Sequence, residues 1–188
     1  MTIISIIIFL FLGIVLLFYF LMSIDSLFGY CDLPTTKRAT KQVLEIISEY
    51  KKQSGIFYDL GCAKGELAIA VKKRFPQLTV YGIEKNGLRI LRARLKAFFL
   101  RKKIFFQKKS ILDVDLRNAD IVYIYLKQSS MNEIGKKLEK ELKDGALVIT
   151  NTTFFPDWQP IKTYITYPKQ PRFEKIFVYI YEKSFSKN

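Results

Sequence analysis

The hydrophobic pattern divides the chain into an apolar N-terminal stretch and a longer region in which short apolar runs alternate with amphipathic segments. In residues 3–24 the apolar and aromatic residues are interrupted only by two serines and one glycine, and the stretch contains no Asp, Glu, Lys or Arg. At about 1.5 Å per residue, a helix of this length reaches roughly 30 Å, the thickness of the hydrocarbon core of a bilayer. The sequence therefore predicts a transmembrane helix over residues 1–24, followed by a connector over residues 25–33.

Two other interpretations of the N-terminal stretch fit less well. A cleaved signal peptide has a basic start, a shorter apolar core and small residues at its end, whereas residues 19–22 are Tyr, Phe, Leu and Met. A buried core helix of this length without a polar face would be unusual. Basic residues follow the stretch closely, at Lys37, Arg38 and Lys41, and none precedes it. By the positive-inside rule, the remainder of the chain is expected on the cytoplasmic side, or on the matrix side if the protein is mitochondrial.

Beyond the connector, the pattern predicts one α/β domain over residues 34–188. Apolar runs typical of buried strands occur at residues 56–60, 78–83, 104–106, 121–126 and 146–150. Segments with helical spacing precede the first strand and follow most of the others, at residues 35–50, 67–75, 86–101 and 129–142. Such alternation predicts a parallel sheet covered on both faces. Residues 162–167 and 173–181, separated by a turn that contains two prolines, predict an antiparallel hairpin at one sheet edge.

Charge and composition exclude several kinds of catalytic site, but they do not identify the binding partner. The net charge of +14 lies entirely beyond residue 24, and it suits anionic lipid, RNA or simply a lysine-rich solvated surface. The same three interpretations apply to the predicted helix that carries Arg89, Arg92, Arg94, Lys96 and Arg101. The chain has no histidine, which excludes His-based zinc sites and Ser-His-Asp triads, and no metal centre is expected. Its two cysteines do not form a disulfide framework.

The clearest chemical motif is a small-residue turn directly after the first predicted strand. It begins with Asp59 and approaches a DxGxGxG pattern, in which the expected nucleotide-contacting positions are Gly61, Cys62, Ala63 and Gly65. Such residues let the backbone approach a ligand at the carboxyl end of the strand. Glu84 ends the second predicted strand, 25 residues after Asp59, where a carboxylate can accept both hydroxyls of a ribose. Because a carboxylate before the glycines suits an amino group and repels a diphosphate, the motif favours S-adenosylmethionine over a dinucleotide.

Several stretches resemble the membrane-anchored lysine methyltransferases that act on the ATP synthase c-subunit and the adenine nucleotide translocase, together with their prokaryotic relatives. The resemblance covers most of residues 33–160 and is carried by Leu33-Pro34-Thr35, Tyr58-Asp59-Leu60-Gly61, Gly82-Ile83-Glu84, Asp113-Val114-Asp115-Leu116, Ala119-Asp120-Ile121-Val122 and Phe155-Pro156-Asp157-Trp158-Gln159-Pro160. It implies a Rossmann-like fold of the seven-stranded methyltransferase type and methylation of a lysine in a membrane protein.

The resemblance also implies roles for individual residues. S-adenosylmethionine would be bound by Asp59, by Glu84 and by the small-residue turn at Gly61, Cys62, Ala63 and Gly65. Ser110 would lie near its adenine. Trp158, Asp157 and Tyr125 are the candidates for the catalytic side. Trp158, Tyr123 or Tyr125 would line the channel for the amine, although both tyrosines and Trp158 also have a core-packing interpretation. The turn departs from the family pattern at Lys64 and Glu66. The family has an acidic residue at the first of these positions and a basic residue at the second. Two alternatives therefore stay open: a methyltransferase for RNA or a small lipid-soluble molecule, and a binding module without catalysis.

Overall fold

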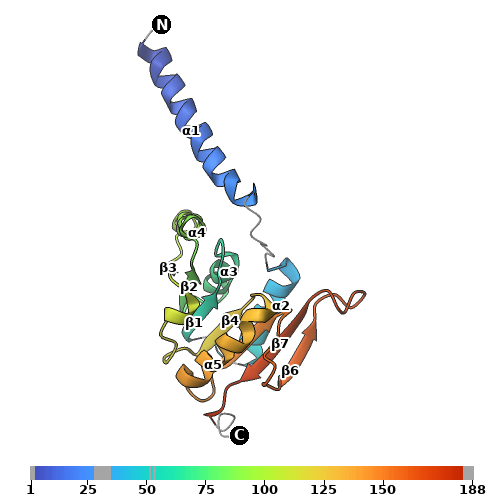
Figure 1. Ribbon diagram of the computed structural model, residues 1–188. Helices are drawn as coiled ribbons and strands as arrows, with labels where there is room; N and C mark the ends of the chain where they lie inside the picture. Colours follow the sequence, from blue (N-terminus) through green and yellow to red (C-terminus); the bar gives the residue numbers. More distant parts are fainter. Residues whose placement is uncertain (1–2, 28–34, 51, 53, 184–188) are drawn as a thin grey trace. The chain divides into compact units, whose positions relative to one another are not determined.

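The computed structural model describes residues 3–27, 35–50, 52 and 54–183, and the chain forms two compact units, residues 1–33 and 34–188. Most of the predicted connector lies outside the described residues. In the first unit, α1 (Ile3–Leu27) is one continuous helix (Figure 1). The large apolar side chains described between Ile3 and Phe20 are 44% to 77% exposed.

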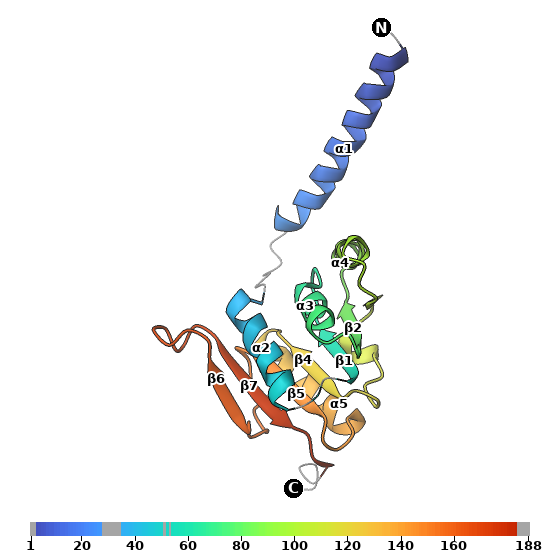
Figure 2. The same ribbon diagram turned by 180° about the vertical axis from the view of Figure 1, so that it is seen from behind.

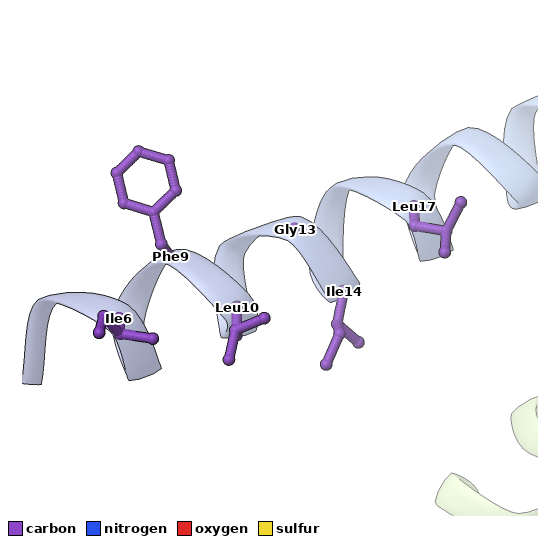
Figure 3. A pocket seen from close by; sticks show the side chains of 6 residues that line it. All are labelled: Ile6, Phe9, Leu10, Gly13, Ile14 and Leu17. Atoms are coloured by element: carbon purple, nitrogen blue, oxygen red, sulfur yellow. The ribbon is translucent and has the colours of Figure 1, made fainter. Parts of the chain in front are cut away.

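Helix α1 carries a shallow apolar groove, but not a ligand site. Its lining comes from α1 alone (Figure 3), namely Ile6, Phe9, Leu10, Gly13, Ile14 and Leu17. Side chains of a single helix cannot enclose a ligand. Among the described residues, no helix combines the length and the apolar character that a membrane crossing requires. The transmembrane helix predicted over residues 1–24 is thus not confirmed; the side chains of Phe18 and of residues 21–27 lie outside what the structure describes.

The second unit is built on one seven-stranded sheet. Its strands are β1 (Gly55–Leu60), β2 (Leu78–Glu84), β3 (Phe105–Lys108), β4 (Ile121–Ile124), β5 (Leu147–Asn151), β6 (Lys162–Ile165) and β7 (Lys175–Ile180). They lie in the order β3-β2-β1-β4-β5-β7-β6. The first five are parallel, whereas β7 is antiparallel to both β5 and β6. The predicted Rossmann-like sheet and its antiparallel hairpin are confirmed.

Helices cover both faces of the sheet (Figures 1 and 2). Buried residues of α2 (Lys37–Glu49), α3 (Glu66–Arg74) and α4 (Gly87–Phe99) pack in one core cluster, and those of α5 (Met131–Glu141) pack in the other. Successive strand residues point to opposite faces, so Phe57 joins the first cluster while Tyr58 and Leu60 join the second. We call these the α2 face and the α5 face.

Local chemistry explains where several elements begin and end. The side chain of Asn86 accepts hydrogen bonds from the N–H groups of Leu88 and Arg89, as predicted for the start of α4. Strand β4 ends at Ile124, two residues earlier than predicted, because its partner Leu60 is the last residue of β1. Beyond Leu60 the chain turns away, and β4 has no neighbour on that side.

The strand order changes direction between β1 and β4, and we call the region beyond the carboxyl ends of these two strands the crevice. From β1 the chain moves outward through β2 to β3, and it then returns to start β4 on the other side of β1. At such a switch point, the connections at the carboxyl ends of the two strands diverge, which leaves room for a ligand. The predicted cofactor turn starts at this end of β1.

Candidate active site

The turn after β1 has the backbone conformation that its small residues suggested. Gly61, Ala63 and Gly65 have φ angles of 85°, 45° and 74°. The N–H groups of Gly61 and Cys62 both donate to the carbonyl oxygen of Ile83, at 2.8 and 2.9 Å, so the turn is tied to the end of β2. The left-handed conformation explains the glycine expected at position 63, and alanine there costs about 1 kcal/mol.

Two positions of this region have no room for a side chain, so glycine is the residue that fits there. A Cβ on Gly65 would lie 2.6 Å from the ring of Phe106, and one on Gly82 would lie 2.5 Å from the same ring. Phe106 lies on β3 and is buried. Its ring therefore fixes the distance between the turn, β2 and β3, a constraint that the sequence pattern did not reveal.

Asp59 is a buried carboxyl at the carboxyl end of β1. Its side chain is only 3% exposed and accepts a hydrogen bond from the backbone N–H of Ala68, in the first turn of α3. Burial is the main cause that raises the pKa of Asp59, and the Ala68 bond opposes the shift; together with the smaller effect of the negative charge of Glu84, the pKa is raised to about 7. A carboxyl in this state gains a favourable partner when a cation enters, so the site fits the amino group of S-adenosylmethionine.

Cys62 forms part of the wall and is not a nucleophile. Its side chain is buried, and a Cβ on Gly82 would lie 3.0 Å from its sulfur. Burial raises the pKa of the thiol far above its usual range, and the charges of Asp59 and Glu84 raise it further. The thiol consequently stays protonated and can contribute only contact area.

Glu84 is held in place at the end of β2. Its Oε1 accepts from the N–H of Asn86 at 2.9 Å, and its Oε2 lies 4.0 Å from Nη1 of Arg89. These contacts leave further lone pairs on the carboxylate for the ribose hydroxyls. The N–H of Lys109 donates to the carbonyl oxygen of Glu84 at 3.1 Å, which brings Ser110 to the same edge of the sheet. The exposed Ser110 caps a short 3₁₀ turn by accepting from Leu112 at 3.3 Å, and its adenine contact stays a prediction.

A second polar cluster lies on the β4 and β5 side of the crevice. The hydroxyl groups of Tyr123 and Thr35 lie 3.0 Å apart, and the amide nitrogen of Asn151 donates to Tyr123 at 3.3 Å and to Glu174 at 3.3 Å. Glu174 also accepts from the hydroxyl groups of Thr36 at 2.8 Å and Thr166 at 2.7 Å. These donors are neutral, so they solvate the buried carboxylate without neutralising its charge. We call Tyr123, Asn151 and Glu174 the polar ledge.

Sequence reasoning missed the carboxylate of the polar ledge. Glu174 directly precedes β7, whose first residues lie beside the end of β5 because the two strands are antiparallel. Only that pairing brings residue 174 to the carboxyl edge, 115 residues after Asp59. An acidic residue next to the apolar strand Lys175–Ile180 was the only available signal.

The structure separates Tyr125 from the other two predicted catalytic residues, Asp157 and Trp158. Tyr125 packs against the α2-face cluster, and its half-buried hydroxyl bonds to the side chain of Thr152; burial raises its pKa, and the charge of Glu174 adds to the shift. Asp157 lies exposed in the loop after β5. Thus Tyr125 packs against the same core cluster that contains Tyr123 of the polar ledge.

Trp158 packs on the α5 face. Its indole N–H donates to Oε1 of Glu139 at 2.9 Å, and its ring lies 4.5 Å from that of Phe155 and 5.7 Å from that of Tyr181. The N–H of Tyr181 donates to the carbonyl oxygen of Ala146. Ala146 directly precedes β5 and Asn151 is its last residue, so Tyr181 lies at the end of the sheet opposite Asn151. The structure therefore does not bring Trp158 to Asp59, and its contacts favour the core-packing interpretation.

Sequence comparison relates this chain to known methyltransferases. Residues 59–162 match the family described as the ANTKMT methyltransferase domain. A protein-lysine N-methyltransferase of Saccharolobus islandicus is 32% identical over 131 residues, which cover 68% of this chain and 80% of that protein. The adenine nucleotide translocase lysine N-methyltransferase of Mus musculus is 27% identical over 132 residues, with 69% of this chain and 57% of the mouse protein covered. The chain thus spans little more than half the length of this mouse relative.

Solved structures support the same fold. An RNA methyltransferase from Salinibacter ruber in complex with S-adenosyl-L-homocysteine has a TM-score of 0.70 and 21% identity, and the match covers 79% of this chain and 93% of that chain. The magnesium protoporphyrin IX methyltransferase of Synechocystis PCC 6803 with bound SAM has a TM-score of 0.64 and 13% identity, with 77% and 79% covered. At these identities the likeness concerns the fold alone.

Proposed function

Since this chain belongs to the ANTKMT methyltransferase family and is an S-adenosylmethionine-dependent methyltransferase, we propose that it transfers the methyl group to the side-chain nitrogen of a lysine in a membrane protein. The observation that carries the proposal is the pair of buried carboxyl groups on the two sides of the crevice, Asp59 on β1 and Glu174 beside β5. A lysine methyltransferase must attract two cationic reactants, and these carboxyl groups provide negative charge on each side.

The β1–β2 side is assigned to the cofactor. S-adenosylmethionine, when bound, supplies an electrophilic methyl group on a sulfonium. Asp59 would hold the amino group of its methionine part, and Glu84 would accept from its ribose hydroxyls. The N–H groups of Gly61 and Cys62 already donate to Ile83 and that of Gly65 donates to Cys62, so the turn is held in place before the cofactor arrives. Such preorganisation lowers the entropic cost of holding a methyl donor in line with its acceptor.

The β4–β5 side is assigned to the lysine. Glu174 would draw the ammonium group toward the crevice through its charge, which its neutral donors leave uncompensated. Tyr125 would orient the amine through its phenolic oxygen, since its raised pKa keeps the phenol protonated and excludes it as the proton acceptor. The nitrogen must lose a proton before it attacks, and water at the crevice is our candidate acceptor. Asp157 and Trp158 are given no part in this step.

One binding measurement and one activity measurement test this assignment. Calorimetric titration of the full chain with S-adenosylhomocysteine should give micromolar affinity that is lost in Asp59→Ala and Glu84→Ala. Glu133→Ala, which removes an exposed carboxylate from α5, is the matched control. Failure of the folded wild-type protein to bind would contradict the cofactor site.

The acceptor is tested separately. The protein is incubated with radiolabelled S-adenosylmethionine and either a membrane-protein fraction or total RNA, and labelled residues are identified by mass spectrometry. Methylated lysine in membrane proteins supports the proposal, while label confined to RNA or to lipid extracts refutes it. Cofactor binding with no turnover on any of these acceptors would instead support a binding module that has lost catalysis.

We also propose that residues 1–24 anchor the enzyme in a membrane with the methyltransferase unit on the cytoplasmic or matrix side. The support is the absence of charge from this stretch and the cluster of basic residues after it. An anchor would confine enzyme and substrate to one plane and raise their effective concentration. Extraction of the full chain from membranes by alkaline carbonate would contradict the anchor, whereas retention until detergent is added would support it.

A further inference from the structure

Helix α4 has two apolar faces, and folding requires only one. Its inward residues Ile90, Ala93 and Ala97 are buried against the sheet. Its outward face carries a second set: Leu91 is 47% exposed, and Phe98 and Phe99 are 76% and 77% exposed. Residues spaced by three, four and seven positions share one side of a helix, so these side chains form a continuous stripe with Leu95. The core of the protein gives no reason for this stripe.

Cationic side chains surround the outward stripe. Arg92 and Lys96 lie along the same helix, and Arg101, Lys102 and Lys103 follow its end. Lys96 pairs with Glu66 at 3.1 Å, and Nζ of Lys103 lies 5.8 Å from the ring centre of Phe105, itself 41% exposed. An apolar stripe bordered by Lys and Arg matches the surface of an anionic bilayer, with its acyl chains beneath a layer of phosphates.

The turn that ends α4 supports a role for its side chains. Arg101 has a φ of 51°, a conformation that glycine adopts without strain. Its N–H donates to the carbonyl oxygen of Phe98, and that of Lys102 donates to Ala97, both at 2.9 Å. This is the Schellman arrangement, in which glycine is the usual residue at the position of Arg101. Arg101 thus carries a long cationic side chain at a position where the backbone conformation favours glycine.

We propose that the outward face of α4 and the following turn, residues 91–103, dock on anionic lipid head groups. Phe98 and Phe99, whose rings lie 5.8 Å apart, enter the acyl boundary, and the cations contact the phosphates. Aromatic and basic residues also bind single-stranded RNA by stacking. The aliphatic Leu91 and Leu95 favour lipid, because they add buried area in a bilayer but offer no stacking surface to a base. This contact is distinct from the anchor proposed for residues 1–24.

A local fluorescent reporter tests the proposal on the full chain. The variant Phe98→Trp adds one indole to the chain, whose native Trp158 packs in the α5-face cluster, and the unmodified protein supplies that background. Both proteins are mixed with vesicles that carry brominated acyl chains, either of pure phosphatidylcholine or with added phosphatidylserine. The added emission should shift to the blue and be quenched with phosphatidylserine, and much less without it. Because the reporter lies on α4, it registers this contact irrespective of where residues 1–24 bind.

Charge variants make the test specific. In the Phe98→Trp background, Arg101→Gly with Lys103→Gln should weaken docking about 25-fold, at about fivefold per cation. Lys136→Gln with Lys140→Gln removes the same charge from exposed positions on α5 and should leave docking unchanged. Arg101→Gly also relieves backbone strain, so weaker docking would not reflect a damaged fold. Equal quenching by both vesicles, or water-like emission that changes only when RNA or a second copy of the chain is supplied, would overturn the proposal.

Discussion

Replacing Asp59 by asparagine should stabilise the protein and weaken its binding of the cofactor. The substitution keeps the shape of the side chain and an oxygen that can accept from the N–H of Ala68. It replaces the second carboxyl oxygen by an amide NH2 group and so removes the charge that a carboxylate must carry in a buried position. The effect on the free energy of unfolding should therefore come from that charge.

The pKa of Asp59 sets the size and the pH range of this effect. Raising it from 3.8 to about 7 corresponds to about 4 kcal/mol between the charged and the neutral carboxyl group. A folded acid with a raised pKa binds more protons than the unfolded chain, so stability is highest below pH 4 and falls as the pH rises to 7. We expect Asp59→Asn to match the wild type near pH 4 and to exceed it by about 2 to 4 kcal/mol at pH 8.

Urea denaturation at several pH values measures this difference. Asp113→Asn, in which an exposed carboxylate is replaced, is the control and should follow the wild-type pH dependence. A difference between Asp59→Asn and wild type that is the same at pH 4 and pH 8, or a less stable variant at pH 8, would refute the reasoning. Binding of S-adenosylhomocysteine at pH 6.5 should also release protons from the wild type, because the incoming amino group lowers the pKa of Asp59. Titration in buffers of different ionisation enthalpy detects that release.

Three further predictions concern single positions. Gly65→Ala should cost more than 2 kcal/mol in a thermal melt because of the Phe106 contact, whereas Gly145→Ala, with a similar φ of 76° and open space around it, should cost about 1 kcal/mol. Glu174→Gln should leave S-adenosylhomocysteine affinity unchanged and reduce kcat/KM for the lysine substrate at least tenfold; unchanged kinetics would remove Glu174 from the site. Trp158→Phe should lose about 1 kcal/mol of stability with its bond to Glu139 and keep full activity, and an inactive but stable variant would restore Trp158 as a site residue.

The sequence was sufficient for the order of the strands and helices and for the cofactor turn. Both depend on local spacing: apolar runs alternate with helical periodicity, and Asp59, Gly61, Gly65 and Glu84 lie within one strand–helix–strand unit. The left-handed conformation of the turn follows from residues that are neighbours in the chain. Local physical rules can therefore predict the conformation of this turn and its candidate role in cofactor binding.

The tertiary structure alone decided what lies on the β4–β5 side. Glu174, our proposed lysine-attracting residue, lies beside the end of β5 only because β7 runs antiparallel to β5, and Trp158 packs against Glu139 and Tyr181 on the α5 face. The outward stripe of α4 became visible only when the buried face of the helix was known. Each of these facts depends on which distant segments meet, and pairings between distant segments are not encoded in the spacing of neighbouring residues.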